Sequence, residues 1–188
     1  MKERGYCSFC GKKLILKTLY NGSREKYCEK CDYVFFLSPF PSVIVMVTNA
    51  NKVLLVRAVD WKHPYWGLIS GFVRLGETAE EAAVREVHEE VSLKASNLEF
   101  LKTYALEARD LLMLAFKVQA EDSSIRKSQE LEAARWFDLR HPLPMRPESI
   151  AARIVQHVFS DITFLDLKEL EKQLPSKRKR EKSGPAGI

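Results

Sequence analysis

The sequence predicts an α/β protein in which a sandwich of strands and helices follows a small cysteine-rich segment. Two observations carry this prediction. Short apolar runs of strand length surround one amphipathic helical pattern, and a second helical pattern follows them. All four cysteines lie in the first 31 residues. The chain has 188 residues, of which 46% are hydrophobic, which is enough for one medium-sized domain and a smaller unit.

The cysteines form two pairs with the spacing of a zinc site. Cys7-x-x-Cys10 and Cys28-x-x-Cys31 are separated by 17 residues, and each pair can place two thiolates on one tetrahedral ion. Gly11 suits the tight turn after the first pair. Four thiolates leave no open coordination position, so we expect one structural Zn²⁺. Disulfide bonds and a redox dithiol are the alternatives, but nothing marks the chain as secreted.

The order of the remaining elements follows from apolar runs and turn residues. Residues 13–20 and 24–28 are two expected strands joined by an Asn-Gly turn, so residues 1–38 resemble a zinc ribbon. We expect one larger domain at 39–174 and a disordered basic tail at 175–188. In the larger domain we expect strands at 42–49, 52–58, 66–71, 97–106, 111–119 and 132–139, a loop at 121–129, and helices from Thr78, at 147–161 and at 165–174.

Charge and hydropathy exclude some classes of protein. No run approaches 18 apolar residues, and the first ten residues lack the apolar stretch of a signal peptide, so we expect a cytoplasmic protein. The net charge is +5, but five Lys/Arg and one Glu lie from Ser176 onward. The rest of the chain is therefore close to neutral. We expect no basic nucleic-acid surface on the folded part.

The helical pattern after Thr78 carries three carboxylates on one face. Thr78 and Glu81 have the spacing of a capping box, which begins a helix. At about 100° per residue, Glu86, Glu89 and Glu90 fall on one narrow face, and each such pair costs about 0.2–0.5 kcal/mol through repulsion. Such a face suits Mg²⁺ or Mn²⁺, although for these three residues alone a solvated acidic face is the better interpretation. The apolar face of the same helix is formed by Ala83, Val84, Val87 and Val91.

The residues around these carboxylates resemble the Nudix box. That family hydrolyses nucleoside diphosphates linked to another moiety, and the resemblance implies an α/β/α sandwich with a mixed sheet. The family has Gly at the position of Ser92, where a left-handed residue is expected to end the helix. The matching positions are Gly71, Glu77, Arg85, Glu86, Glu89, Glu90 and Leu93.

A zinc ribbon that leads directly into such a domain resembles the NADH pyrophosphatase branch of the family. The resemblance runs from about Cys7 to about Phe159, and it includes the segments 130–137 and 142–155. The proline- and aromatic-rich specificity array of that branch is absent, because residues 103–111 read TYALEARDL here. The architecture therefore resembles the branch, while its specificity feature is missing.

The resemblance implies roles at the expected metal site. Glu86 and Glu90 are expected to bind Mg²⁺ or Mn²⁺, and Glu89 is expected to be a further ligand or the base that accepts the proton of water. A backbone carbonyl of Ser70 or Gly71 is expected to complete the coordination.

Three further polar residues receive roles from the resemblance. Glu130 is expected to join the metal ligands from the loop before the last strand. Arg85 is expected to orient a carboxylate without touching metal, and Glu77 is expected to be its ion-pair partner. The candidates for stacking on a nucleobase are Tyr65, Trp66, Tyr104 and Trp136, the last of which also suits the core.

We therefore expect metal-dependent hydrolysis of the diphosphate linkage of a nucleoside diphosphate derivative, such as ADP-ribose or NADH, to two monophosphates. Two alternatives stay open. One is removal of a nucleotide cap from RNA by the same chemistry. The other is a binding module without turnover, although such a module has no need of three mutually repelling glutamates. The oligomeric state also stays open, with a homodimer as one option.

Overall fold

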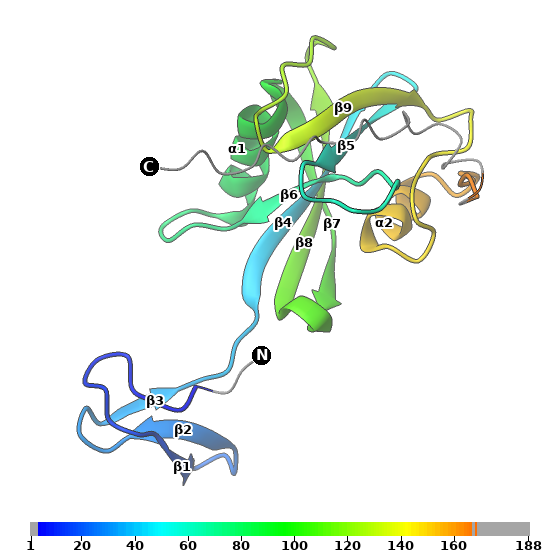
Figure 1. Ribbon diagram of the computed structural model, residues 1–188. Coiled ribbons are helices and arrows are strands. Elements are labelled where there is room, and N and C mark those ends of the chain that lie inside the picture. Colours follow the sequence, from blue (N-terminus) through cyan, green and yellow to red (C-terminus); the bar gives the residue numbers. More distant parts are fainter. Residues whose placement is uncertain (1–3, 167, 169–188) are drawn as a thin grey trace, which may run out of the picture.

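The computed structural model describes residues 4–166 and residue 168, and its two sheets lie apart from each other (Figure 1). The smaller sheet has the order β1-β2-β3, and the larger has the order β7-β8-β4-β5-β9 with β6 paired to β4. In Figure 1 the chain passes from the small sheet to the large one through the segment that enters β4. The expected tail at 175–188, the end of the expected domain at 174 and most of the expected helix at 165–174 lie outside the described residues.

The ribbon is an antiparallel three-stranded sheet of short strands. Its first two strands pair with Ile15 opposite Tyr27, and the turn between them is closed by the Leu19 N–H, which donates to the Ser23 carbonyl. Gly22 in this turn has a φ of 83°, which explains why glycine stands there. The third strand was not predicted, because its three residues are too few for a recognisable pattern. The strands are β1 (Ile15–Thr18), β2 (Arg24–Cys28) and β3 (Tyr33–Phe35).

The large sheet is mixed. β4 pairs with β8 in parallel, whereas the other strand pairs of this sheet are antiparallel. The fifth expected strand, now β8, starts where predicted, but β6 begins three residues later than predicted, because the expected start at Trp66 makes only an isolated bridge to Met145. The strands are β4 (Phe40–Asn49), β5 (Lys52–Ala58), β6 (Ile69–Phe72), β7 (Ala95–Leu106), β8 (Leu111–Ala120) and β9 (Leu131–Asp138).

Strand β4 organises two cores because it is buried on both faces. Val43, Val45 and Val47 belong to one buried cluster, and Ile44 and Met46 belong to another. This alternation follows from the two-residue period of a strand. Helix α1 (Ala79–Val91) packs against the first cluster and helix α2 (Ile150–Val158) against the second, which confirms the expected α/β/α sandwich with a mixed sheet.

Both helices begin at side-chain caps. In α1 the Thr78 hydroxyl accepts from the Glu81 N–H while the Glu81 carboxylate accepts from the Thr78 N–H, as the capping box predicts. In α2 the Ser149 hydroxyl accepts from the Ala152 N–H, so the helix starts at Ile150 rather than at 147. It ends before Phe159, which makes it shorter than the expected span of 147–161.

The end of α1 and the segment after β7 have left-handed residues. Ser92 adopts a φ of 58° and donates its N–H to the His88 carbonyl, so the helix ends as it would with glycine. Between β7 and β8, Glu107–Arg109 form a short 3₁₀ helix, η1, which closes at Asp110 with a φ of 56°. The sequence pattern did not indicate η1. Among the described residues, no helix is long and apolar enough to cross a membrane.

Candidate active site and metal centres

The four ribbon cysteines lie together. The sulfur atoms of Cys7, Cys10, Cys28 and Cys31 are all within 4.8 Å of one another, with 3.9 Å between Cys7 and Cys31 and 3.5 Å between Cys10 and Cys28. All four are free thiols, so the disulfide alternative is not what the structure shows. Four thiolates at about 2.3 Å from one Zn²⁺ lie about 3.8 Å apart in a tetrahedron. The separations therefore fit a single tetrahedral ion.

The backbone of the first cysteine pair has the shape of a metal-binding turn. The Gly11 N–H donates to the Cys7 carbonyl, the Phe9 N–H donates to the Cys7 sulfur at 3.4 Å, and Gly11 has a φ of 71°. A hydrogen bond from the Lys12 backbone lowers the pKa of the Cys10 thiol to about 7. The hydrogen bond with Cys10 raises the pKa of Cys31 to about 12. Without a cation these crowded sulfurs cannot all be thiolates.

The second site begins with Arg85, which joins three glutamates. Its Nε and Nη2 donate to the two carboxylate oxygens of Glu77 at 2.6 and 2.9 Å. Its Nη1 donates to Glu86 at 2.6 Å and to Glu89 at 3.0 Å. Nη2 also donates to the Phe72 carbonyl at 2.9 Å. The structure thus brings together Glu77, Arg85, Glu86 and Glu89, with the ion pair between Arg85 and Glu77 that the resemblance implied.

The hydrogen bonds between Arg85 and Glu77 shift the pKa values of both groups. Arg85 is the first cause of the lowered pKa of Glu77, which falls to about 2. The Glu77 hydrogen bond in turn raises the pKa of Arg85 above its ordinary value. The pair therefore stays ionised at neutral pH. Because the Arg74 N–H also donates to Glu77, the loop before α1 is tied to the helix.

Glu90 lies in a different environment from the other two box glutamates of α1. Seven residues at about 100° each place it about 20° from buried Ala83, so its side chain is on the core-facing side of the helix. From the sequence, Glu90 was predicted to lie beside Glu86 and Glu89, away from the core. Val84, expected in the core, is exposed instead. The apolar face is centred on Ala83 and Val87, so Val84 falls at its edge and Glu90 falls within it.

The carboxylate of Glu90 is partly buried and incompletely satisfied. Its Oε2 atom is buried and has no hydrogen-bond partner among the described residues. Burial, followed by the charge of Glu86, raises the pKa of Glu90 to about 8, while a backbone hydrogen bond with Ser70 lowers it and the charge of Glu130 raises it. A buried carboxylate next to two others is the environment that a hard divalent cation stabilises.

Gly71 shows how closely the strand approaches the helix. A Cβ atom built on Gly71 would lie 1.9 Å from the Glu86 Oε1 atom, so any other residue would displace that carboxylate. Ser70 and Gly71 are in β6, opposite Ile44 and Val43 of β4. This pairing holds the β6 backbone against α1, where Ser70 reaches Glu90 and Gly71 reaches Glu86.

Glu130 reaches the same region through the end of α1. The Ser128 N–H donates to the Glu90 carbonyl at 2.8 Å, and the Arg126 N–H donates to the Val91 carbonyl at 3.0 Å. The loop before β9 therefore caps the last carbonyls of the helix. Glu130 follows directly and raises the pKa of Glu90 by its charge. This charge effect is consistent with the expected proximity of Glu130, whose side chain is exposed.

Two arginines were not singled out from the sequence. Arg74 donates to both oxygens of Glu89 at 3.1 and 3.0 Å. Arg57 is buried and donates to Glu132 and to the carbonyls of His63 and Tyr65, which fixes the loop between β5 and β6. A charged residue in an apolar strand such as 52–58 was the available signal, because a buried arginine requires partners.

The four aromatic residues considered for base stacking have structural contacts. Trp136 donates to the Ser123 carbonyl and packs beside the core, and Trp66 packs edge-on against Phe137 at 5.0 Å. Tyr104 is buried, and Tyr65 lies beside His63. These contacts show no open stacking platform at Tyr104 or Trp136.

The fold and the arrangement of glutamates around Arg85 define a member of a known family. The NUDIX domain matches residues 38–158, and the chain belongs to the NUDIX family. Among curated proteins it is 32% identical over 149 residues to the NAD-capped RNA hydrolase NudC of Pseudomonas fluorescens, which covers 79% of this chain and 52% of that protein. It is 32% identical over 164 residues to the protein of the same name from Chromobacterium violaceum, covering 86% and 60%. The chain thus spans about half the length of the curated relatives it matches.

Solved structures show the same fold. The NUDIX hydrolase of Nitrosomonas europaea superimposes with a TM-score of 0.64 at 21% identity, over 86% of this chain and 97% of that one. The NUDIX domain of Shewanella oneidensis NrtR, solved with ADP ribose, gives a TM-score of 0.54 at 19% identity, over 71% and 92%. At these identities the likeness concerns the fold.

We expect one tightly bound Zn²⁺ per chain, and we expect the double substitution Cys28→Ser and Cys31→Ser to abolish it. The buried residues of the ribbon are Cys7, Leu14 and Cys28, so without metal the ribbon has almost no core and should unfold. Elemental analysis of protein purified without added metal measures the zinc, and limited proteolysis between residues 4 and 38 measures the folding. Ser8→Ala, within the same turn, should retain zinc. Zinc that survives the double substitution would refute the assignment.

We expect divalent metal to stabilise the protein more at high pH than at low pH. The pKa of Glu90 rises from 4.5 to about 8 on folding, so metal-free protein should lose stability as pH rises through this window. Thermal unfolding with EDTA and with Mg²⁺, at pH 5.5 and 8.5, measures the difference. Burial, followed by the charge of Arg57, lowers the pKa of His63, so His63 makes the folded protein more stable as pH rises, opposite to Glu90. Glu90→Gln is therefore the reference, because it retains His63.

Glu90→Gln should remove both the loss of stability and the gain from Mg²⁺, because the amide has no proton to lose and binds cations weakly. Glu80→Gln is the matched control, since Glu80 is an exposed carboxylate in the first turn of the same helix. Equal stabilisation by Mg²⁺ at the two pH values would contradict this account of Glu90.

Proposed function

We propose that this chain hydrolyses the diphosphate linkage of a nucleoside diphosphate derivative of the ADP-ribose or dinucleotide type, giving two monophosphates. The observation that carries the proposal is the Glu90 carboxylate, which has one buried, unpartnered oxygen, a backbone hydrogen bond with Ser70 and the charge of Glu86 nearby, while Glu86 itself lies against Gly71. Glu86, Glu90 and Glu130, with a backbone carbonyl of Ser70 or Gly71, would hold Mg²⁺ or Mn²⁺. When bound, such a cation neutralises the diphosphate oxygens and acidifies water.

The remaining box residues are proposed to position the ligands. Arg85 lies against Glu77 on one side and against Glu86 and Glu89 on the other, so it fixes two carboxylates of α1 relative to the preceding loop. Glu77 anchors Arg85, because its two oxygens accept from Nε and Nη2 of the guanidinium. These two residues are therefore positioning residues.

Glu89 is the carboxylate best placed to accept a proton from water. Its side chain is 44% exposed, whereas that of Glu86 is 13% exposed, and one oxygen of Glu90 is fully buried. Arg74 and Arg85 hold it over the same helix face. We propose that Glu89 is the base that accepts the proton of water and that it can also bind the metal.

The ribbon is proposed to hold one structural Zn²⁺ through its four cysteines. Four thiolates occupy all positions of a tetrahedral ion, so the zinc has no place for water or substrate. Its contribution is to fold residues 4–38, whose own apolar core is small. We propose that this unit ends near residue 38, where the matched NUDIX domain begins.

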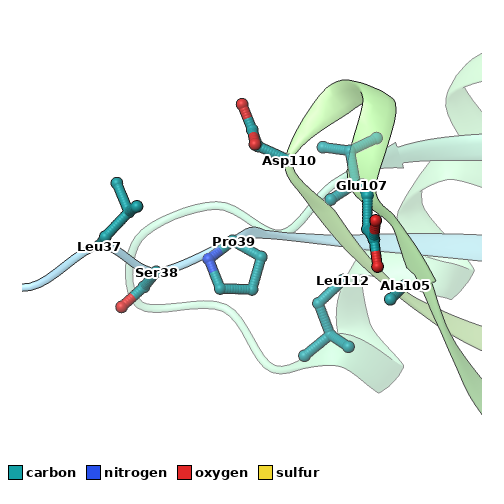
Figure 2. Close-up of a pocket in the computed structure, with 8 residues that line it drawn as sticks. Leu37, Ser38, Pro39, Ala105, Glu107, Asp110 and Leu112 are labelled. Carbon is teal, nitrogen blue, oxygen red and sulfur yellow. The ribbon is translucent and has the colours of Figure 1, made fainter. Parts of the chain in front are cut away.

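The selectivity for the second half of the substrate is proposed to be weak. Residues 103–111, where the NADH pyrophosphatase branch carries its array, form the end of β7, η1 and the start of β8. Tyr104 of this segment is buried, and Glu107 and Asp110 line a pocket beside the entry to β4 (Figure 2). This pocket is lined by two acids and several aliphatic side chains, and it offers no aromatic slot for a nicotinamide ring.

Removal of an NAD cap from RNA is a second candidate function. It is favoured by the relatives, which are named NAD-capped RNA hydrolase NudC and match from 79% to 86% of this chain. The bond that is broken is the same, namely the diphosphate of a dinucleotide. The two candidates differ only in what continues from the adenosine.

We expect Glu86→Gln and Glu90→Gln each to reduce kcat at least about a hundredfold, because loss of a metal ligand should exceed the 10–100-fold that supporting residues typically cost. Glu130→Gln should reduce it less, since that side chain is exposed. Glu80→Gln is the control and should retain the activity. Steady-state hydrolysis of ADP-ribose at saturating Mg²⁺ measures the effects. Losses of only a few fold for both α1 variants would place the metal elsewhere.

We expect ADP-ribose and NADH to be hydrolysed with kcat/KM values within roughly tenfold of each other, which is about 1.4 kcal/mol of transition-state discrimination. The reason is that the box contacts the diphosphate, while the array that would select nicotinamide is missing. Competition between the two compounds at fixed Mg²⁺, with the monophosphate products separated, measures the ratio. A hundredfold preference for NADH would show that another surface selects the nicotinamide.

A further inference from the structure

A groove of about 790 Å³ runs along the ribbon toward the start of β4. Its basic side chains are Arg4, Arg24 and Lys26, and one carboxylate, Glu25, lies among them. Its aromatic lining comes from Tyr33, Phe35 and Phe36 of the ribbon and from Phe40 at its end. Cations and aromatic rings are thus interleaved along one surface, which neither the zinc site nor the box glutamates use.

The charge of the chain is segregated between its two units. Residues 4–38 contain seven Lys/Arg and three Asp/Glu, whereas residues 39–175 contain 17 Lys/Arg and 20 Asp/Glu. The near-neutral total before Ser176, from which we expected no basic surface, hides this division. The ribbon is therefore the basic unit of the folded chain, and an anion that contacts the protein is attracted to the ribbon more than to the larger domain.

Several of the aromatic rings are accessible. Phe36 is 65% exposed, and Tyr33 is also exposed. Tyr33 and Phe35 lie edge to face at 4.9 Å, and the Arg4 guanidinium lies over the Phe35 ring at 5.0 Å. Exposed rings flanked by cations are suited to stacking of unpaired bases with phosphates held alongside.

The groove ends at Phe40, whose ring contact leads toward the candidate active site. Phe40, at the end of the groove, contacts the Phe72 ring at 6.5 Å between centroids, and both rings are more than half exposed. The Phe72 carbonyl accepts from Arg85. The Phe40–Phe72 pair therefore lies between the groove and Arg85, which positions Glu86 and Glu89. The pocket of Figure 2 is the other exit, but its lining includes Glu107 and Asp110, which disfavour an anionic strand.

We propose that the ribbon groove binds a single-stranded RNA segment that continues from a dinucleotide held at the box glutamates. The phosphates would lie against Arg4, Arg24 and Lys26, and unpaired bases would stack on Tyr33 and Phe36. Phe40 and Phe72 would carry the strand from the groove to the diphosphate. The inference rests on the proposed diphosphate hydrolysis for its catalytic part, and on the groove alone for its binding part.

The test compares two double variants of the full chain that each remove one cation and one aromatic ring from the ribbon. The groove variant is Arg24→Ala with Phe36→Ala, and both residues are exposed, so the fold should persist. The control variant is Lys12→Ala with Tyr20→Ala, which are exposed on the same ribbon and are not among the groove residues. Both variants keep the basic residues beyond Ser176, so a difference between them reports the groove.

Binding is measured by fluorescence anisotropy with a labelled single-stranded RNA of about ten nucleotides, over a series of salt concentrations. Each double variant is combined with Glu90→Gln so that no turnover interferes. We expect the groove variant to bind at least about tenfold more weakly, because loss of one stacking ring alone typically costs that much. Its salt dependence should fall by about 0.7 in slope for the lost phosphate contact. The control variant should stay within about twofold.

Hydrolysis then links binding to the active site. In the background that retains Glu90, the ratio of kcat/KM for NAD-capped RNA to that for free NAD⁺ should fall at least about tenfold in the groove variant, for the same stacking contact. It should be unchanged in the control variant. Equal RNA binding by both variants would overturn the proposal. If the unsubstituted chain is a dimer and the groove variant is a monomer that still binds RNA, the proposal also fails, because a second copy of the chain would then occupy the groove. If NAD-capped RNA, NAD⁺ and ADP-ribose all remain uncleaved, the proposed function fails, while the anisotropy still decides whether the groove binds RNA.

Discussion

The guanidinium of Arg85 is the interaction on which the candidate site depends. It joins the loop residue Glu77 to Glu86 and Glu89 of α1 and to the β6 carbonyl of Phe72. Three carboxylates placed this closely repel one another, and one delocalised cation with several fixed N–H donors offsets that repulsion in a defined geometry. A lysine would supply the charge without the planar fork. Strand, loop and helix are therefore held in register by one side chain.

Glu90 is held by a different physical constraint. It does not contact Arg85, and its unpartnered oxygen is buried next to the core that α1 forms with β4. A carboxylate in this place costs stability at neutral pH unless it binds a proton or a cation. The site therefore combines carboxylates that Arg85 neutralises with one that has a buried, unpartnered oxygen. Strand β6 lies close to these carboxylates, with Gly71 against Glu86 and the Ser70 backbone hydrogen-bonded to Glu90.

Local sequence signals predicted the parts of this arrangement that depend on neighbours in the chain. The capping box at Thr78, the strand at 52–58 and the paired cysteines each depend on residues that are close in sequence, and each is found as expected. The burial of Glu90 was missed because the three glutamates were assigned to one face, although the helical period sets Glu90 near Ala83. Arg57 was missed because its partners, the carbonyls of His63 and Tyr65 and the Glu132 carboxylate, are assembled only by the tertiary fold.

The end of α1 shows how a departure from the family pattern can be tolerated. Ser92 adopts the left-handed conformation in place of glycine, which costs about 1–2 kcal/mol for a residue with a Cβ atom. The carbonyls at this end are satisfied by the N–H groups of Arg126 and Ser128, so the last turn is fixed from outside the helix. The same two hydrogen bonds place the loop that carries Glu130 beside Glu90. The hydrogen bonds that close the helix thus also hold the start of the loop that leads to Glu130, and they offset the strain at Ser92.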